Sequence, residues 1–295
     1  PANTDLIVEY VYDAKAPVVR GGGDVTDARS VSIVMRHSLI EIPKNDYQPR
    51  YDDPRVGYFT TRLTDLTSTE VAPYRDMIRR WHLIKKNPKA KLSKPVKPIT
   101  FWIENTTPKE IRKVVKKGAL AWNKAFEQAG FKDAIEVKVQ PDDADWDAGD
   151  IRYNVLRWTS SPRPPFGGYG PSFANPRTGE ILGADIMLEY IYVSIRLWYD
   201  RVFETAASPA SVDPYGLPEN PHLCTIARGL HEETLFGLQA LKVMGASKVE
   251  MNDLLEDGLQ RLILHEIGHT LALTHNFRGS YLHDPVSIHD KKVTG

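Results

Sequence analysis

The sequence predicts an α+β protein in which a mixed, twisted sheet is backed by one helix and has a second helix packed beneath it. Three observations predict this class. Short β-branched and aromatic runs fill the first 70 positions, and a strand–helix–strand pattern starts near position 98. The last periodic segment, from Met251 to about Leu273, has the apolar spacing of a long helix. The 295 residues are enough for one large and one small domain.

The chain divides into three units. Residues 1–75 form a small β-rich region, whose strand-like runs are Leu6–Tyr12, Val31–Met35 and Gly57–Leu63. Residues 76–98 form the second unit, for which we expect a short helix over 76–86 and a linker rich in Lys and Pro over 85–98. Residues 99–295 form the third unit, which carries the chemistry.

The third unit begins with a strand over Pro98–Glu104 and a helix that follows it. Thr107 is the expected N-cap and Pro108 the first helical residue, and the helix is expected to run to Ala129 and stop at Gly130. Its apolar face is Ile111, Val115, Ala119, Trp122 and Phe126. Further strands are expected at Ile135–Val139, Ile151–Trp158 and Ile181–Leu188, and further helices at Tyr190–Glu204 and His231–Met244.

Composition excludes some classes of function. Lys plus Arg and Asp plus Glu both number 38, so there is no basic excess to support binding of nucleic acid or an anionic membrane. The most apolar stretch is too short and too charged to cross a bilayer, so no membrane span is expected. The single cysteine, Cys224, excludes an intrachain disulfide; it is expected to be a small buried residue rather than a zinc ligand.

The last helix contains the strongest chemical signal, His265-Glu266-Ile267-Gly268-His269, followed by His275. Residues four apart share a helix face, so His265 and His269 can direct two imidazole nitrogens to one ion. Zinc favours such ligands in a tetrahedral array, and a catalytic site keeps one position for water. Glu266 can then take a proton from that water as it attacks a carbonyl. His275 can bind only if the helix ends after His269 and the chain folds back.

The alternative is an exposed amphipathic helix with incidental histidines. The apolar neighbours favour a buried helix, in which an unliganded histidine pair would be costly. These neighbours are Leu259, Leu262, Ile263, Ile267 and Leu271.

Other candidate sites are weaker. Five aspartates between Asp142 and Asp150 would suit Ca²⁺, but Ala148 stands where an EF-hand loop has glycine, and we favour a solvated acidic turn. His231 starts a zinc-like motif that has Leu235 in place of a second histidine, so a helix start is favoured. His283 and His289 are interpreted as surface residues rather than extra ligands.

The segment from His265 to His275 resembles the metzincin clan of zinc endopeptidases, in which a helix gives two histidines and the base and the next loop gives the third histidine. Most of the chain is similar to a bacterial family of zinc-dependent metallopeptidases with a preceding β-rich domain. The phrases that carry this similarity are Asp53–Phe59, Lys94–Ile99, Ile151–Trp158, Tyr169–Ser172, Pro176–Ile181 and His275–Phe277. The resemblance implies a metzincin-like catalytic domain over 99–295, one catalytic Zn²⁺, a peptide or protein substrate, and a location in the periplasm, at the cell surface or outside the cell.

The resemblance also implies a substrate-binding edge strand above the zinc. By position it is Gly168, Tyr169, Gly170, Pro171 and Ser172, whose glycines would let a peptide backbone approach. A plain Gly/Pro surface loop is the alternative for this stretch.

Two features depart from the metzincin pattern. Ala272 stands where these enzymes usually have the glycine that allows the turn before the third histidine. No methionine follows His275, so we expect the methionine turn in a remaining C-terminal part of the same protein. The leading hypothesis is a zinc-dependent endopeptidase. The alternatives are a zinc-containing peptide-binding module with little or no turnover and, last, a structural zinc site, for which the sequence offers no fourth ligand.

Overall fold

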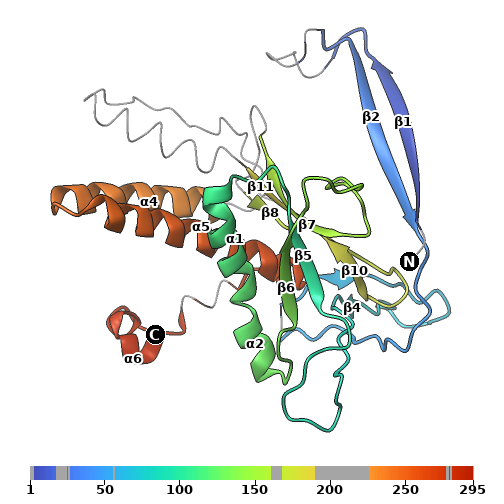
Figure 1. Ribbon diagram of the computed structural model, residues 1–295. Helices are drawn as coiled ribbons and strands as arrows, with labels where there is room; N and C mark the ends of the chain where they lie inside the picture. The colour runs from blue at the N-terminus through green and yellow to red at the C-terminus, as the bar shows by residue number, and fades with distance from the viewer. Residues whose placement is uncertain are drawn as a thin grey trace.

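The computed structural model describes residues 3–17, 25, 27–55, 57–160, 168–189, 226–276, 279 and 281–294. Its centre is a five-stranded sheet with the order β6-β5-β7-β11-β8 (Figure 1). Four of the strands run parallel to one another: β5 (Ile99–Ile103), β6 (Ile135–Val139), β7 (Asn154–Thr159) and β11 (Ile186–Glu189). The edge strand β8 (Gly168–Tyr169) runs antiparallel to β11, so the sheet is mixed as expected.

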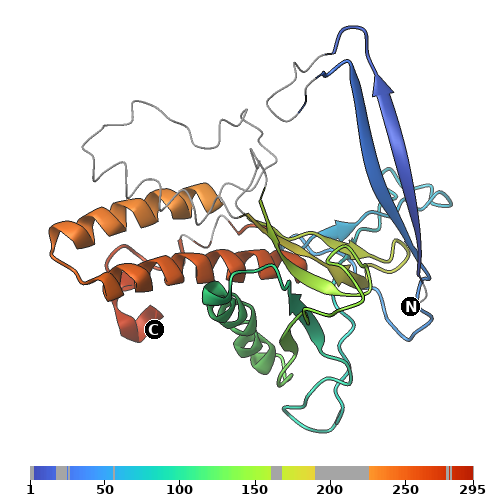
Figure 2. The ribbon, with the colours of Figure 1, turned by 45° about the horizontal axis from the view of Figure 1, so that its top comes forward.

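Helices cover one face of this sheet. Alternate residues of β5 are buried and point to the same side, where α1 (Lys109–Leu120), α2 (Asn123–Gln128) and α5 (Lys248–Thr270) lie. A single apolar core joins these elements, and its members include Phe101, Val115, Ile186, Leu262 and Ile267. The helix α4 (Ile226–Val243) lies alongside α5 and extends with it beyond the sheet (Figure 2). The predicted α+β class, with a backing helix and an active-site helix, is confirmed.

The backing helix differs from the expected one in two details. Pro108, not Thr107, occupies the N-cap position; Thr107 is buried, and no side chain caps the helix. The helix breaks at Ala121 and Trp122, so the expected single helix is α1 followed by α2. The Trp122 indole donates to the Leu264 carbonyl of α5 at 2.8 Å, which is a tertiary contact that helical periodicity does not predict. The predicted helix stop at Gly130 is confirmed, because Gly130 has a φ of +87° and so takes the left-handed conformation that ends a helix.

Capping signals define the start of α5. Ser247 accepts a hydrogen bond from the Glu250 backbone, and the Glu250 side chain accepts one from the Ser247 backbone, which is a capping box. Gly245, at a φ of +74°, ends the preceding helix. The helix therefore begins three residues before the predicted Met251 and ends three before Leu273. Among the described helices, none has the length and apolar character needed to cross a membrane.

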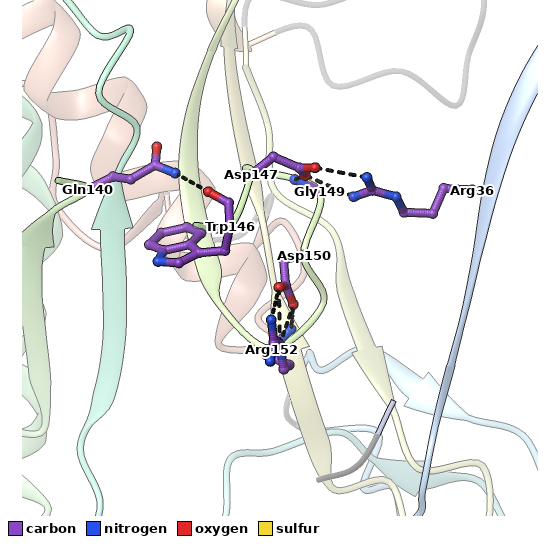
Figure 3. Close-up of polar contacts among 7 residues, drawn as sticks. All are labelled: Arg36, Gln140, Trp146, Asp147, Gly149, Asp150 and Arg152. Carbon is purple, nitrogen blue, oxygen red and sulfur yellow. Dashed lines mark hydrogen bonds and ion pairs between the residues drawn. The ribbon is translucent and has the colours of Figure 1, made fainter. Parts of the chain in front are cut away.

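The N-terminal region forms a long antiparallel hairpin and contributes to one small sheet, and a second small sheet lies in the third unit. The hairpin strands β1 (Asn3–Asp13) and β2 (Ser30–Ile40) include the predicted runs and project away from the central sheet (Figure 1). Arg36 of β2 donates two hydrogen bonds of 2.8 Å to Asp147, in the loop between β6 and β7, which links the hairpin to the body (Figure 3). The small sheets pair β3 (Thr60–Thr61) with β4 (Met77–Ile78), and β9 (Ser172–Ala174) with β10 (Ile181–Ala184).

The short helix expected over residues 76–86 is wrong. Met77 and Ile78 form β4, and the backbone of Arg80 exchanges hydrogen bonds with Gly179 and Ile181. These tertiary backbone hydrogen bonds hold the segment extended and override its local helical preference. The strand predicted over 181–188 is interrupted at Asp185 and forms β10 and β11. The helix expected over 190–204 lies outside the described residues. The domain boundaries stay a prediction.

Asp185 lies in the interruption between β10 and β11. Its Oδ1 accepts a hydrogen bond of 2.8 Å from the Val155 backbone. Burial raises the pKa of this carboxyl to about 6, although the Val155 hydrogen bond and the nearby Arg157 lower it in part. Between about pH 4 and pH 6 the folded state therefore holds a proton that the unfolded state has released. The contribution of Asp185 to the free energy of unfolding is complete below about pH 4 and is lost as pH rises through 6.

We predict that Asp185→Asn is more stable than the wild type at pH 8, by up to about 3 kcal/mol. The amide keeps an acceptor for the Val155 N–H and has no charge to bury. Near pH 4, where the wild-type side chain is protonated, the two proteins should have the same free energy of unfolding. Urea denaturation at both pH values measures the difference; an equal gap at pH 4 and pH 8 would contradict this account.

Candidate metal centre

The structure brings His265, His269 and His275 together. One ring nitrogen from each lies within 4.8 Å of the other two, and in the described part of the chain this is the one group of three or more His, Cys, Asp or Glu residues with such geometry. The ring centroids are 4.5 to 5.0 Å apart. Two of the histidines come from the last turns of α5 and the third from the segment that follows the helix.

The end of α5 determines where the third histidine lies. Ala272 N donates to His269 O and Leu273 N donates to Gly268 O, and these two hydrogen bonds form a Schellman motif. Ala272 occupies the left-handed position of the motif, with a φ of +69° and a fully buried side chain. A residue with a Cβ costs about 1 kcal/mol there relative to glycine. Ala272 therefore makes the turn that metzincins usually build with glycine, and His275 is directed back toward His265.

The histidine rings have the protonation that a metal ligand needs. The His269 Nδ1 lies 2.8 Å from the Leu273 carbonyl, so Nδ1 carries the proton and Nε2 keeps its lone pair. Burial, followed by the proximity of His269 and His275, lowers the pKa of His265 to about 4. Burial also lowers the pKa of His269, although the Leu273 contact opposes it. Both rings are therefore neutral at pH 7.

Nitrogen spacing at the cluster fits a zinc ion. The Nε2 atoms of His265 and His275 are 3.2 Å apart. Two corners of a tetrahedron around zinc, with Zn–N distances of 2.0–2.1 Å, are separated by about 3.3–3.4 Å. Three imidazoles around one ion leave one tetrahedral position for a non-protein ligand, which is the donor set of a catalytic rather than a structural site.

Glu266 is almost completely buried, at 1% exposure, beside the first histidine. Its Oε1 is buried and has no hydrogen-bond partner among the described residues. Burial raises the pKa of this carboxyl to about 7, and a hydrogen bond from the Gly170 backbone lowers it in part. A buried carboxylate oxygen without a protein partner fits a site that receives a water or a substrate group.

The candidate substrate strand lies directly against Glu266. A Cβ on Gly168 would lie 2.9 Å from the Glu266 Oε1, and a Cβ on Gly170 would lie 2.5 Å from the Glu266 backbone oxygen. At Gly170 a side chain would displace the strand from α5, whereas at Gly168 it would press on the Glu266 side chain. Gly168 and Tyr169 form the edge strand β8, Pro171 follows Gly170, and Ser172 begins β9. Of the five residues predicted as an edge strand, Gly168 and Tyr169 thus lie at the edge of the central sheet, whereas Ser172 belongs to the separate β9–β10 sheet; their role in substrate binding stays a prediction.

Sequence reasoning missed two residues at this centre. The Trp81 indole donates to the Thr270 carbonyl at 2.9 Å, and the Phe59 ring centroid lies 5.7 Å from that of His269. Phe59 comes from the N-terminal region and Trp81 from the unit after it, and both lie more than 180 positions before the histidines. No local pattern in the sequence connects them with the motif.

The weaker candidates do not form a second cluster in the described residues. In the acidic loop, Asp147 is bound to Arg36 and Asp150 to Arg152, so two of the five aspartates are engaged in ion pairs (Figure 3). Asp150 is buried, and the solvated acidic turn stays a prediction. His289 is exposed in a short 3₁₀ helix, Ser287–His289, which precedes α6 (Lys291–Thr294). His231 lies within α4, not at its start. Cys224 lies outside the described residues.

Two protein-family models match parts of the chain. Residues 1–86 match a domain of unknown function (DUF5117), and residues 247–295 match the family described as Met-zincin. Comparisons with curated proteins and with solved structures gave no match. The second model covers α5, its terminal turn and all three histidines, whereas the first covers Phe59 and Trp81.

We predict that His275→Ala lowers zinc affinity by more than about 100-fold, because it removes one of three protein ligands. His289→Ala is the matched control, since it removes an exposed histidine from the same C-terminal segment and should leave affinity unchanged. Competition with a chromophoric chelator measures both values. Equal affinities of His275→Ala and the wild type would exclude the third ligand.

Proposed function

We propose that this chain, a metzincin-type zinc metallopeptidase with an N-terminal domain of unknown function, cleaves internal peptide bonds with Glu266 as the general base. The observation that supports this most is the buried Oε1 of Glu266, which has no hydrogen-bond partner in the part of the chain that the structure describes, beside the three converging histidines. His265, His269 and His275 would hold the metal. When bound, zinc supplies Lewis acidity to the scissile carbonyl and lowers the pKa of a water molecule.

The chemistry of Glu266 suits proton transfer near neutral pH. A carboxyl with a pKa of about 7 is a stronger base than an exposed glutamate and still exists partly as the acid. The Glu266 carboxylate takes the proton of the attacking water and then gives it to the leaving amine. Its burial keeps bulk water from competing for that proton.

The edge strand gives the site a means of holding a peptide. As the last strand of the sheet, β8 has β11 on one side, so an extended substrate can add to the other side by main-chain hydrogen bonds. This mode binds backbone rather than particular side chains, and it suits a protein substrate in an extended conformation. A location outside the cytoplasm, in the periplasm, at the cell surface or secreted, is part of this proposal.

We predict that Glu266→Gln lowers kcat for peptide hydrolysis by at least about 100-fold and leaves zinc content unchanged, because it removes a general base but no ligand. Glu256→Gln, on an exposed position of the same helix, is the matched control and should keep full activity. A quenched fluorescent peptide library and metal analysis measure the two properties. Full activity of Glu266→Gln would remove the base assignment. Tight peptide binding without cleavage by the wild type would favour a binding module instead.

Substrate binding by the edge strand is tested with Gly170→Ala. The added Cβ would lie 2.5 Å from a backbone atom of α5, so β8 must move away from the helix. We predict a fall in kcat/KM of at least about 10-fold, since a misplacement near 1 Å has effects of this order or larger. Gly279→Ala, at an exposed glycine where the nearest atom to an added Cβ is 4.0 Å away, is the matched control and should stay within twofold. Unchanged kcat/KM in Gly170→Ala would argue against this strand as the binding edge.

A further inference from the structure

The N-terminal region makes direct backbone contact with the turn that carries the third histidine. Phe59 N donates to Ala272 O at 2.7 Å, and Thr274 N donates to Gly57 O at 3.2 Å. Tyr58 and Leu273 face each other as an antiparallel bridge between these two hydrogen bonds. Residues 57–59 therefore form a short antiparallel ladder with residues 272–274, directly before His275.

The two backbones approach closely at this ladder. A Cβ on Gly57 would lie 2.5 Å from the Thr274 Oγ1, so glycine provides the space for Thr274. The Phe59 ring lies against the His269 ring on the same side of the turn. The ladder thus touches both the turn and one of the histidines.

Trp81 stabilises the end of α5 from the same region. The last carbonyls of a helix lack partners within the helix, and the Schellman motif uses those of Gly268 and His269. The Thr270 carbonyl is instead bound by the Trp81 indole N–H at 2.9 Å. One donor from the N-terminal region therefore completes the termination of the helix that carries two of the histidines.

These contacts rest on a continuous set of backbone hydrogen bonds. Residues 60–61 continue from the ladder as β3 and pair with β4, and Arg79 N donates to Phe59 O at 2.9 Å. Arg80 then pairs with the start of β10 through Gly179 O and Ile181 N. The ladder is therefore hydrogen-bonded, through β3 and β4, to the start of β10.

We propose that residues 57–61 and 77–81, here called the N-terminal clamp, are positioning residues of the metal centre. The clamp holds Ala272 in its left-handed conformation and keeps His275 in reach of the site occupied by zinc. The proposal rests on the proposed function and gives a role to the end of the segment that matches a domain of unknown function. Phe59 and Trp81 act through the turn and through His269, and neither is a ligand.

The experiment compares zinc affinity of full-length Trp81→Phe, Phe59→Ala and the double variant with that of the wild type. Trp81→Phe keeps an aromatic ring and removes the indole donor, whereas Phe59→Ala removes the ring against His269. Residues that orient metal ligands typically contribute 10- to 100-fold in affinity, and we expect a fall of this size in the double variant. The visible spectrum of the Co²⁺-substituted double variant should show the altered coordination that follows loss of His275.

Trp102→Phe is the matched control. Trp102 lies in β5 and packs on Trp146 and Tyr153, so this variant changes the same residue type without touching the turn. It should keep wild-type zinc affinity even if its melting temperature falls. Phe59→Leu, which restores apolar bulk beside His269, should recover most of the affinity lost in Phe59→Ala.

Hydrogen exchange of the metal-free proteins gives a readout without zinc. The amides of Ala272, Leu273 and Thr274 should exchange faster in the double variant than in the wild type or Trp102→Phe. Wild-type zinc affinity, Co²⁺ spectrum and exchange in the double variant would overturn the clamp and leave the endopeptidase proposal intact. A wild type that binds zinc and cleaves no peptide, combined with weakened zinc binding in the double variant, would overturn the endopeptidase proposal and support the clamp. A wild type that binds no zinc would overturn both.

Discussion

The metal centre depends on how α5 ends. Three imidazoles can meet only if the helix stops within three residues of His269 and the chain turns back, because a continued helix would carry His275 about 9 Å further along the axis. The Schellman hydrogen bonds at Gly268 and His269 provide this stop, and Ala272 provides the left-handed residue. The conformational cost at Ala272, about 1 kcal/mol, is small compared with what the surrounding hydrogen bonds contribute together.

A second constraint fixes the base. The sheet edge passes so close to α5 that a Cβ at position 170 would meet the helix backbone and one at position 168 would meet the Glu266 side chain. This closeness removes water from Glu266 and raises the pKa of its carboxyl. The same contact therefore places a strand edge within reach of a substrate and gives the carboxyl the proton affinity that the proposed chemistry needs.

Much of this arrangement was predictable from local sequence. The strand runs, the helix stop at Gly130 and the spacing of His265 and His269 depend on neighbours a few residues apart, and they agree with the structure, whereas the expected Thr107 N-cap does not. The failures have a common cause in contacts between distant segments. Residues 77–80 are extended because their backbone pairs with Thr60, Thr61 and the start of β10. The helix breaks after α1 where the Trp122 indole donates a hydrogen bond to α5.

The turn at Ala272 shows where sequence reasoning about the site stops. An alanine at position 272 is compatible with a left-handed turn that directs His275 back or with a chain that leaves the helix in another direction. Which of the two conformations forms depends on hydrogen-bond donors that lie far away in the chain. Phe59 and Trp81 provide such donors, and they are separated from the turn by 213 and 189 positions. A single sequence has no periodicity or motif that connects residues at such distances.

The contacts between the two matched segments bear on how the chain should be divided. The segment 85–98 has the composition of a linker, yet it contains ordered contacts. The Lys85 ammonium donates hydrogen bonds to the carbonyls of Ala90 and Lys91, and the Lys85 backbone forms an isolated antiparallel β-bridge with Pro95. Lysine here satisfies backbone carbonyls of an irregular loop, a use that composition does not reveal. Within the same segment, the Ser93 backbone pairs with Lys132 and Gly130, and before it the Phe59 backbone pairs with Ala272. Because hydrogen bonds cross the composition boundary at several points, unfolding of residues 57–81 would expose the end of α5, and the metal centre would lose its support in the same event.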